Sequence, residues 1–458
     1  MNNNITLICP TNAYGSSATS GIYYPMGILL VGSVVKKRMN CEMNLVDGEG
    51  KSVSDLEKAI IGTKILGLSA NTDNYPYCVQ LANFSKNIGI QKIVIGGPHS
   101  TARARQILQN QPAIDIAVKY DGEEAFSQIL QGRELSSIPN LVWRDGNTIR
   151  ENAVILPRDP PRLTSMDYSL LDLSLYWEIH QRAFPAMSKK FIEGFTHYGC
   201  RWREIGLKVA AKEGRDGGGC EFCDIPYLTN VYQDPEKFWK DLREINREWG
   251  IESFKDYGDC FTGNSAKVQA FLEARPKDLE HITFSCYGRS PEIKEHMADM
   301  LQQLNVKYVY IGLDSGSNSM LKSMHEGYTI DQNKKAIDLL SKREIYITGS
   351  LIVGAEGESE ETIAETESFA KEIVTNPYVS QISCSVLTPF PGAPVGRKLI
   401  KRFPHLEEKD LWDSNALTRL WAENFCKVSY EYLVSKADQI NSLKIAFRKR
   451  YFGYTKSP

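Results

Sequence analysis

The sequence predicts an α/β protein with two runs of alternating strands and helices, followed by a helical tail. Three observations predict this class. Short apolar segments alternate with helical patterns from residue 5 to about 145, the alternation resumes near Phe191, and six further strand candidates follow. At 458 residues the chain is long enough for two domains of ordinary size and an appendage. We expect boundaries at 1–145, 146–185, 186–400 and 401–458.

The first run is expected to form a doubly wound, Rossmann-like domain over residues 1–145. Its strand candidates are Ile5–Cys9, Met43–Asp47, Ile65–Ser69, Ile93–Ile95 and Ile114–Val118. Helical patterns such as Met26–Lys37 and Ser54–Ile61 lie between them. Continuously apolar strands joined by helices predict a parallel sheet with helices on both faces. Ligands of such sheets bind beyond the carboxyl ends of the strands, where this sequence is polar and rich in glycine.

The second run is expected to form a partial (β/α)6 barrel of the TIM type over residues 186–400. Its strand candidates are Phe191–Tyr198, Ser253–Tyr257, Ile282–Cys286, Tyr308–Leu313, Tyr346–Val353 and Ile382–Leu387. The active site of a barrel lies at the C-terminal ends of its strands. The proline-rich stretch from Asn147 to Asp172 is interpreted as a linker, and residues 401–458 as a helical segment.

Composition excludes several classes of protein. The formal net charge of −2 gives no general attraction to nucleic acid or to an anionic membrane. The longest apolar run, Gly27–Val35, is too short to span a bilayer, and the N-terminus does not resemble a signal peptide. A cytoplasmic location is therefore expected. Its ten scattered cysteines are not expected to form a disulfide framework there.

Only Cys200, Cys220 and Cys223 cluster in the sequence and call for a chemical explanation. Three thiolates can hold a four-iron cluster and leave one iron open for another ligand. A single Cys-x-x-Cys pair is also compatible with a zinc knuckle or a redox pair. No second Cys-x-x-Cys or histidine pair is present to complete a zinc site, and the pair follows three glycines, Gly217 to Gly219.

The motifs around these cysteines resemble the radical S-adenosylmethionine (SAM) family, in its cobalamin-binding branch. The runs Asp259-Cys-Phe-Thr-Gly-Asn264, Ile311-Gly-Leu-Asp-Ser-Gly-Ser317 and Gly354-Ala-Glu-Gly-Glu-Ser359 carry the resemblance, although Asp314 and Glu356 depart from the usual glutamate and proline. The resemblance implies that SAM is bound by Phe222, Asp259, Asn264, Arg289, Asp314, Ser315 and Gly354. All of these follow predicted barrel strands or cluster cysteines.

The first domain resembles the cobalamin-binding domain of the same branch through Tyr24-Pro-Met-Gly27, Gly96-Gly-Pro-His99 and Asp121-Gly-Glu-Glu124. The resemblance implies cobalamin contacts at Pro25, Gly27, Ser69, Asn71, Thr72, Gly96, Gly97, His99, Gly122 and Glu123. The Asp-x-His-x-x-Gly signature of other cobalamin proteins is absent, so no histidine ligand to cobalt is expected, and a cap or turn role is expected for His99. The alternative is a doubly wound domain that has lost its ligand.

The sequence departs from the family where nineteen residues, 201–219, separate Cys200 from Cys220 instead of three. The longer loop costs only ~1.6 kcal/mol of closure entropy. A helical pattern predicts a small excursion, and we expect Arg201, Trp202, Arg203 and Lys208 to form part of the substrate wall. The alternatives are an idle surface excursion, or a degenerate cluster with Cys200 as an ordinary strand-end cysteine.

The resemblance implies three cofactors: a [4Fe-4S] cluster, SAM and cobalamin. The open iron would bind SAM, and a deoxyadenosyl radical would take hydrogen from an unactivated carbon. Three functions stay open: methylation of a small-molecule or peptide substrate, cyclisation or rearrangement without methyl transfer, and a non-catalytic cobalamin- or metal-binding regulator. An external electron donor such as flavodoxin or ferredoxin is also implied. No catalytic side chain can be named, and neither nucleic-acid binding nor a membrane span is expected.

Overall fold

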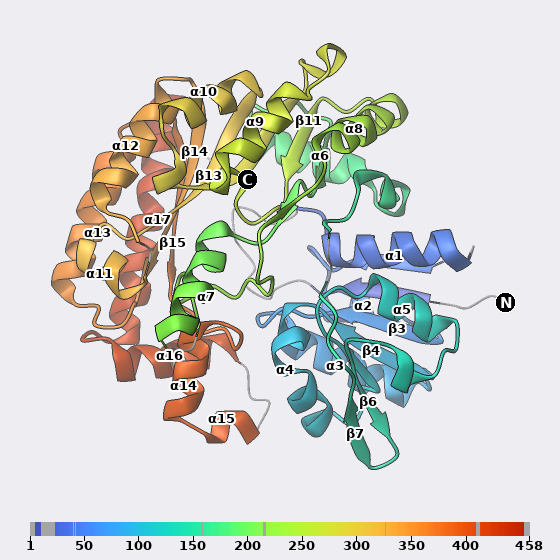
Figure 1. The fold of residues 1–458 in the computed structure, drawn as a ribbon. Helices are drawn as coiled ribbons and strands as arrows, with labels where there is room; N and C mark the ends of the chain where they lie inside the picture. Colours follow the sequence, from blue (N-terminus) through green and yellow to red (C-terminus); the bar gives the residue numbers. More distant parts are fainter. Residues whose placement is uncertain are drawn as a thin grey trace. The chain divides into compact units, whose positions relative to one another are not determined.

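The computed structural model describes residues 5–10, 23–39, 41, 43–156, 159–213, 217–325, 327–408 and 413–452 (Figure 1). The chain divides into two compact units. The N-terminal unit comprises Met1–Arg158, Thr164–His180 and Phe390–Ser414, and the barrel unit comprises Asp159–Leu163, Gln181–Pro389 and Asn415–Pro458. The chain therefore enters the N-terminal unit more than once.

The N-terminal unit is built on a seven-stranded sheet of order β2-β1-β3-β4-β5-β6-β7. The strands are β1 (Ile5–Cys9), β2 (Met43–Asp47), β3 (Ile65–Ser69), β4 (Lys92–Gly96), β5 (Ile116–Val118), β6 (Leu141–Asp145) and β7 (Thr148–Glu151). The first five pair in parallel, which confirms the predicted doubly wound sheet and its five strands to within two residues at each end.

Strands β6 and β7 differ from the prediction because they pair antiparallel and extend the sheet at one edge. The stretch from Asn147, interpreted as a linker, thus begins with a sheet strand. A turn through Gly146, whose φ is +58°, joins the two strands. Asp-Gly between short apolar runs is a recognised hairpin signal, and the sequence carries it at Asp145-Gly146.

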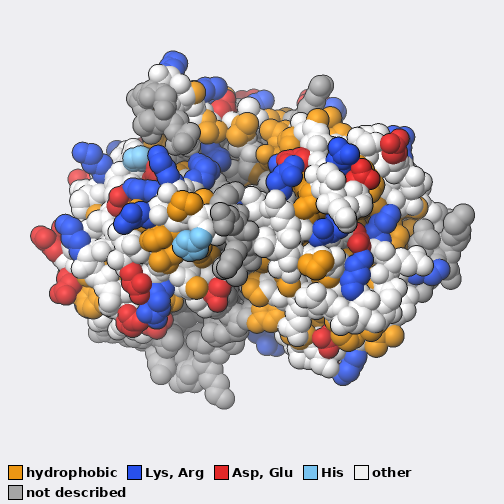
Figure 2. Space-filling view, turned by 90° about the horizontal axis from the view of Figure 1, so that it is seen from below, with side chains coloured by type: hydrophobic (Ala, Val, Ile, Leu, Met, Phe, Trp, Pro, Cys, Tyr) orange, Lys and Arg blue, Asp and Glu red, His pale blue; other side chains and the backbone are white. Residues whose placement is uncertain are grey.

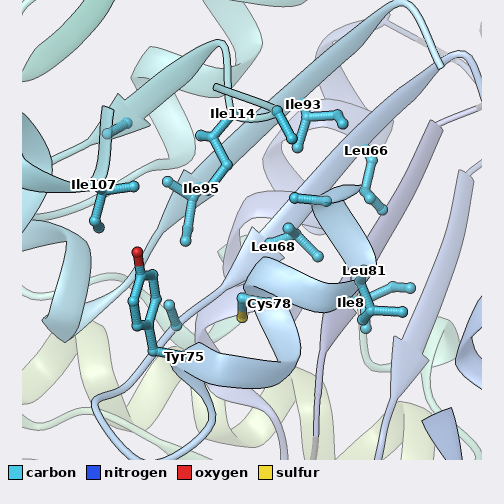
Figure 3. Close-up of a cluster of buried hydrophobic side chains, with 14 of the residues drawn as sticks. Ile8, Leu66, Leu68, Tyr75, Cys78, Leu81, Ile93, Ile95, Ile107 and Ile114 are labelled. Carbon is cyan, nitrogen blue, oxygen red and sulfur yellow. The ribbon is translucent and has the colours of Figure 1, made fainter. Parts of the chain in front are cut away.

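Helices cover both faces of this sheet. On one face the helices are α2 (Val53–Ala59), α3 (Tyr75–Asn87) and α4 (Pro98–Asn110), and on the other α1 (Met26–Met39) and α5 (Glu123–Leu130). Alternate residues of β1 face opposite ways, so Ile8 joins the first core and Leu7 the second. In Figure 3, Leu81 of α3 lies beside Ile8 of β1, and Ile95 of β4 lies near Ile107 of α4. This burial fixes the strand ends that carry the candidate cobalamin residues.

The barrel unit contains six parallel strands in the order β15-β14-β13-β12-β11-β8. They are β8 (Phe191–Gly194), β11 (Ser253–Asp256), β12 (Thr283–Arg289), β13 (Val306–Asp314), β14 (Tyr346–Val353) and β15 (Val379–Val386). The six predicted barrel strands are confirmed. The first is shorter than expected, because His197–Tyr198 forms a separate strand, β9, that pairs antiparallel with β10 (Val231–Tyr232).

Helices follow the barrel strands and lie along the outside of the sheet in Figure 1. They are α8 (Pro235–Trp249), α9 (Ser265–Glu273), α10 (Glu295–Gln303), α11 (Asn318–Ser323), α12 (Ile330–Ser341) and α13 (Glu360–Ile373). The edge strand β15 is covered by α17 (Tyr430–Phe452). Asn441 of α17 binds both backbone groups of Cys384, with distances of 2.7 and 2.9 Å. The helical tail therefore closes an exposed sheet edge.

The helices at the end of the chain confirm the predicted helical tail. Some of them belong to the N-terminal unit and the others to the barrel unit. They are α14 (Pro394–Arg402), α15 (His405–Glu408), α16 (Ser414–Phe425) and α17, while α6 (Leu173–Ala183) precedes the barrel. Arg103 of α4 donates a hydrogen bond to the carbonyl of Leu406 at 2.9 Å, which ties α15 to the N-terminal unit. Within the described ranges no helix has the length and apolar character needed to cross a membrane. On the face drawn in Figure 2, basic and acidic side chains are intermixed.

Candidate functional site

Cys200 lies at the start of helix α7 (Arg201–Glu213), immediately after β9. A hydrogen bond from the thiol of Cys260 lowers the pKa of Cys200 most, although burial opposes this. The backbone N–H of Arg203, the positive charge of Arg289 and the backbone N–H of Trp202 lower it further, to about 6. Free N–H groups at a helix N-terminus favour a thiolate. Thiolates are the ligands of iron–sulfur clusters, so the local structure prepares Cys200 for that role.

The insert forms a helical excursion that folds back on itself. After α7 the segment 217–219 lies directly on the helix: a Cβ on Gly206 would come within 2.1 Å of the backbone nitrogen of Gly219. A Cβ on Gly218 would come within 2.2 Å of the nitrogen of Leu207. Only glycine permits this close approach. The contact returns the chain beside the first turn of α7, which reconciles the nineteen-residue spacing with a compact cysteine site.

Cys220 and Cys223 occupy the turn that follows. The N–H of Cys223 donates to the carbonyl of Cys220 at 3.1 Å, and Arg203 donates to the carbonyl of Cys223 at 3.4 Å. Burial raises the pKa of Cys223 to about 12, and the nearby Cys200 adds to this increase. The structure thus brings the three cysteines to one place.

Among the described residues, no three His, Cys, Asp or Glu side chains converge on the position of a single metal ion. The thiolates of a four-iron cluster bind different irons and are spaced more widely. The donor set of three thiols beside a helix N-terminus fits such a cluster, with the fourth iron left to SAM.

A buried network fixes the loop after β11 against the cysteine loop. The carboxylate of Asp256 accepts hydrogen bonds from both the N–H and the hydroxyl of Thr196, at 2.9 and 2.7 Å. Asp259 accepts from the N–H of Gly199 at 2.7 Å, one residue before Cys200. Asp259, predicted from the sequence as a SAM residue, therefore lies next to the first cluster cysteine.

Arg289 and Asp314 lie at the ends of β12 and β13, as predicted. The guanidinium of Arg289 lies 4.9 Å from the centroid of the Trp202 ring and 5.5 Å from that of Tyr328. The phenol of Tyr328 donates a hydrogen bond to Asp314 at 2.5 Å. Asp314 has a φ of +55°, a conformation that Asp tolerates better than most residues, at an irregularity between β13 and β14. Sequence reasoning missed Tyr328, which no local motif marks.

The other predicted SAM residues have structural partners of their own. Asn264 caps α9, and the hydroxyl of Ser315 is fully buried against Thr366 at 3.0 Å. Gly354, with φ +92°, accepts a hydrogen bond from the indole of Trp421 at 2.9 Å. Phe222, which lies between Cys220 and Cys223 in the sequence, is half-buried. We propose Phe222, Asp259, Arg289 and Asp314 as the direct contacts, and Asn264, Ser315 and Gly354 as supports.

At the N-terminal unit, small half-buried residues line the carboxyl edge of the sheet, as a large flat ligand requires. They are Ser69, Asn71, Gly96, Gly97 and Gly122. Gly97 has a φ of +97°, and a Cβ there would lie 2.5 Å from the carbonyl oxygen of Ala70. Gly27, after Pro25 at the start of α1, approaches Ser69. Part of the polar segment 10–21, expected at the same edge, lies outside the described residues.

His99 and Thr72 lie behind this edge rather than on it. Nδ1 of His99 is 3.2 Å from the hydroxyl of Thr72, and the imidazole stacks on Tyr75 with centroids 4.2 Å apart. The His99 side chain is fully buried. These contacts indicate that His99 supports the loop at the edge of the sheet, and they favour the prediction that no histidine binds cobalt.

Glu123, at the start of α5, has an altered acidity. Burial, and after it the neighbouring Asp121, raises the pKa of Glu123 to about 7.

Residues 217–370 match the Radical SAM superfamily, and residues 17–130 match the B12 binding domain. The chain is a cobalamin-dependent radical SAM enzyme. Its cofactors are accordingly a [4Fe-4S] cluster, SAM and cobalamin, and such enzymes need a substrate and an external electron donor. The fold and the cofactors predicted from the sequence are confirmed.

The chain is 24% identical over 378 residues to an uncharacterized methyltransferase of Pyrococcus horikoshii, covering 80% of this chain and 76% of that relative. It is 21% identical to the anaerobic magnesium-protoporphyrin IX monomethyl ester cyclase of Cereibacter sphaeroides, covering 86% of this chain and 63% of that relative. Among solved structures, the radical SAM methyltransferase TsrM of Kitasatospora setae superposes with a TM-score of 0.63 at 16% identity, over 87% and 76% of the chains. The cobalamin-dependent enzyme OxsB superposes with 0.60 at 14%, over 99% and 62%. Both structures share the fold.

Proposed function

We propose that this radical SAM enzyme methylates an unactivated carbon of a small-molecule or peptide substrate. The observation that carries the proposal is that Cys200, Cys220 and Cys223 meet beside Arg289 and Asp259, in a chain that also has a B12-binding domain. The names of two relatives support the same outcome, since the Pyrococcus protein and TsrM are both described as methyltransferases.

The residues of the candidate site would bind and orient the cofactors. When bound, the cluster with SAM supplies a carbon-centred radical, and cobalamin supplies the methyl group. Cys200, Cys220 and Cys223 would hold the cluster and leave one iron open. Arg289 and Asp314 would orient SAM by charge and hydrogen bonds. Removal of a hydrogen atom requires no general base, so none has to be assigned.

One face of the barrel sheet offers hydrogen bonds to a substrate. Tyr310 pairs in register with Thr348 on β14, and Ser285 pairs with Tyr308, two residues before Tyr310 on the same face. The hydroxyls of Ser285, Tyr310 and Thr348 are buried; those of Ser285 and Tyr310 interact with each other, whereas that of Thr348 makes no hydrogen bond to the described residues. A buried hydroxyl without a partner costs about 1–3 kcal/mol. A polar group of the substrate would remove this penalty, which supports binding on this face.

The proposal is tested with SAM that carries a deuterated methyl group. Anaerobically reconstituted enzyme, with cobalamin and a reduced flavodoxin, is incubated with small-molecule and peptide fractions of an extract from the source cells. We expect deoxyadenosine and S-adenosylhomocysteine to form together, and a deuterated methyl group to appear on a product carbon by mass spectrometry. Deoxyadenosine without S-adenosylhomocysteine would contradict methyl transfer.

A second candidate is cyclisation or rearrangement without methyl transfer. The similarity to the magnesium-protoporphyrin IX monomethyl ester cyclase favours it, because it covers 86% of this chain. The same experiment separates the two. A cyclase would release deoxyadenosine and give products that carry no deuterium from the labelled methyl group.

A further inference from the structure

The insert between Cys200 and Cys220 contributes Trp202 to the surroundings of Arg289. We propose that Trp202 is a positioning residue for SAM, and that it acts by holding, together with Tyr328, the guanidinium of Arg289. This inference rests on the proposed role of Arg289 as a SAM contact.

Two aromatic rings and a carboxylate lie close to Arg289. Its guanidinium lies 4.9 Å from the ring centroid of Trp202 and 5.5 Å from that of Tyr328. Glu292 provides a carboxylate oxygen at 3.3 Å, and the side chain of Arg289 is only 12% exposed. A guanidinium over the face of tryptophan is the strongest common cation–π arrangement. The arginine thus loses its rotamer freedom before SAM arrives, which lowers the entropic cost of binding.

Trp202 is itself fixed in place. Its indole N–H donates a hydrogen bond to the carbonyl of His325 at 3.2 Å. Its ring lies against Gly327, where a Cβ would approach the ring to 2.4 Å. Gly327 also has a φ of +72°, so glycine is favoured there by both the backbone and the neighbouring ring.

The chain just beyond the insert is anchored on the same segment. The N–H of Glu221 donates to the carbonyl of Met324 at 3.0 Å, and its carboxylate lies 2.8 Å from Nδ1 of His325. The start of the insert and the residue that follows Cys220 therefore both contact the segment around His325. The phenol of Tyr328, which lies just beyond, donates to Asp314 at 2.5 Å. One continuous set of contacts joins the insert to both proposed SAM residues.

The test measures SAM binding to anaerobically reconstituted protein by titration calorimetry, and the shift of the electron paramagnetic resonance spectrum of the reduced cluster on SAM addition. Trp202→Ala should raise the Kd for SAM about tenfold and weaken the spectral shift, with iron content unchanged. Trp202→Phe, which keeps an aromatic face, should stay within about threefold of the parent. Ile205→Ala changes an exposed residue of the same helix and should bind SAM normally.

Trp202→Leu keeps apolar bulk without an aromatic face, and should weaken SAM binding as Trp202→Ala does. Equal SAM affinity in Trp202→Leu and Trp202→Phe would overturn the inference, even if Trp202→Ala loses its cluster. Loss of iron in all three variants would assign Trp202 to cluster retention and would overturn it as well. Parent protein with a full cluster but no SAM binding would contradict the proposed function itself, whereas normal parent binding that Trp202→Ala leaves unchanged would contradict this inference alone.

Discussion

The Nε2 atom of His197 accepts a hydrogen bond from the backbone N–H of Cys260 at 2.7 Å. The other ring nitrogen, Nδ1, therefore carries the hydrogen, and it lies 2.9 Å from the hydroxyl oxygen of Thr196 and 3.3 Å from the carboxylate of Asp256. All of these residues are buried. The imidazole, stacked on Tyr232, thus joins the strand that leads to Cys200 with the loop that carries Asp259 and Cys260.

Replacing His197 by phenylalanine should keep the ring packing and leave the N–H of Cys260 without an acceptor. An unsatisfied buried donor costs about 1–3 kcal/mol, so the free energy of unfolding of the apoprotein should fall by that amount. Urea unfolding measures it, and iron content after reconstitution should fall in parallel. His281→Gln, at an exposed histidine, is the control and should change neither quantity. A fully stable His197→Phe variant would show that the bond is dispensable.

The close approach of Gly206 to Gly219 gives a second prediction. Gly206→Ala should lower the iron content at least severalfold, because the added Cβ would push the segment that leads to Cys220 away from α7. Helix propensity alone predicts the opposite sign, since alanine stabilises a helix by about 1 kcal/mol relative to glycine. Val209→Ala, at an exposed position of α7, should retain its iron. Normal iron content in Gly206→Ala would show that the close contact between α7 and residues 217–219 is not needed to place Cys220.

Lys255 and Glu193 lie fully buried on neighbouring strands, with a nitrogen–oxygen distance of 3.4 Å, and burial holds the pKa of Lys255 well below its ordinary value. Lys255→Met should destabilise the barrel unit by about 1–3 kcal/mol, because it takes a buried polar partner away from Glu193. The double variant Glu193→Leu with Lys255→Met should recover most of that loss. Lys267→Met, at an exposed lysine, should cost little. Equal unfolding free energies for the single and double variants in urea would contradict the coupling.

Glu123 gives a prediction of pH dependence. Burial, then Asp121, raises its pKa to about 7 in the folded state, against about 4.3 in an unfolded chain. Between these values the folded state binds more protons than the unfolded one, so stability falls as pH rises, and the penalty is complete above about pH 7. The protection of α5 against hydrogen exchange, corrected for intrinsic rates, should therefore drop from pH 5 to pH 8.

The size of this drop should be on the order of 2 kcal/mol. Glu123→Gln cannot ionise and should remove it. Glu124→Gln is the control, because the pKa of Glu124 is lowered, chiefly by Gln128, and its titration lies below this range. A pH-independent protection of α5 in the parent protein would contradict a raised pKa at Glu123.

Periodicity in the sequence was sufficient to predict all six barrel strands and the five parallel strands of the first sheet, because buried parallel strands form continuous apolar runs. It missed the β6–β7 hairpin, whose Asp145-Gly146 turn was readable but was absorbed into a linker. The cofactors followed from motifs with fixed spacing.

The residues that position the cluster cysteines and Arg289 could not be predicted from sequence periodicity or motifs. Trp202 and Tyr328 meet around Arg289 although they are far apart in the chain, and their sequence neighbours give no sign of this contact. The insert folds back onto α7 only because Gly206 and Gly218 have no side chain at the point of contact. Such contacts become visible only when the backbone path is known. That the insert forms a wall of the substrate site stays a prediction, although Lys208 is exposed and paired with Glu204.

The central claim is that the three widely spaced cysteines hold one cluster, and iron analysis of single variants tests it most directly. The parent protein, reconstituted without oxygen, should contain about four irons per chain. Cys200→Ala, Cys220→Ala and Cys223→Ala should each lose the cluster. Cys260→Ser is the sharpest control, because Cys260 contacts Cys200 but is not needed as a ligand, and it should keep its iron. Full iron content in Cys200→Ala would contradict the assignment.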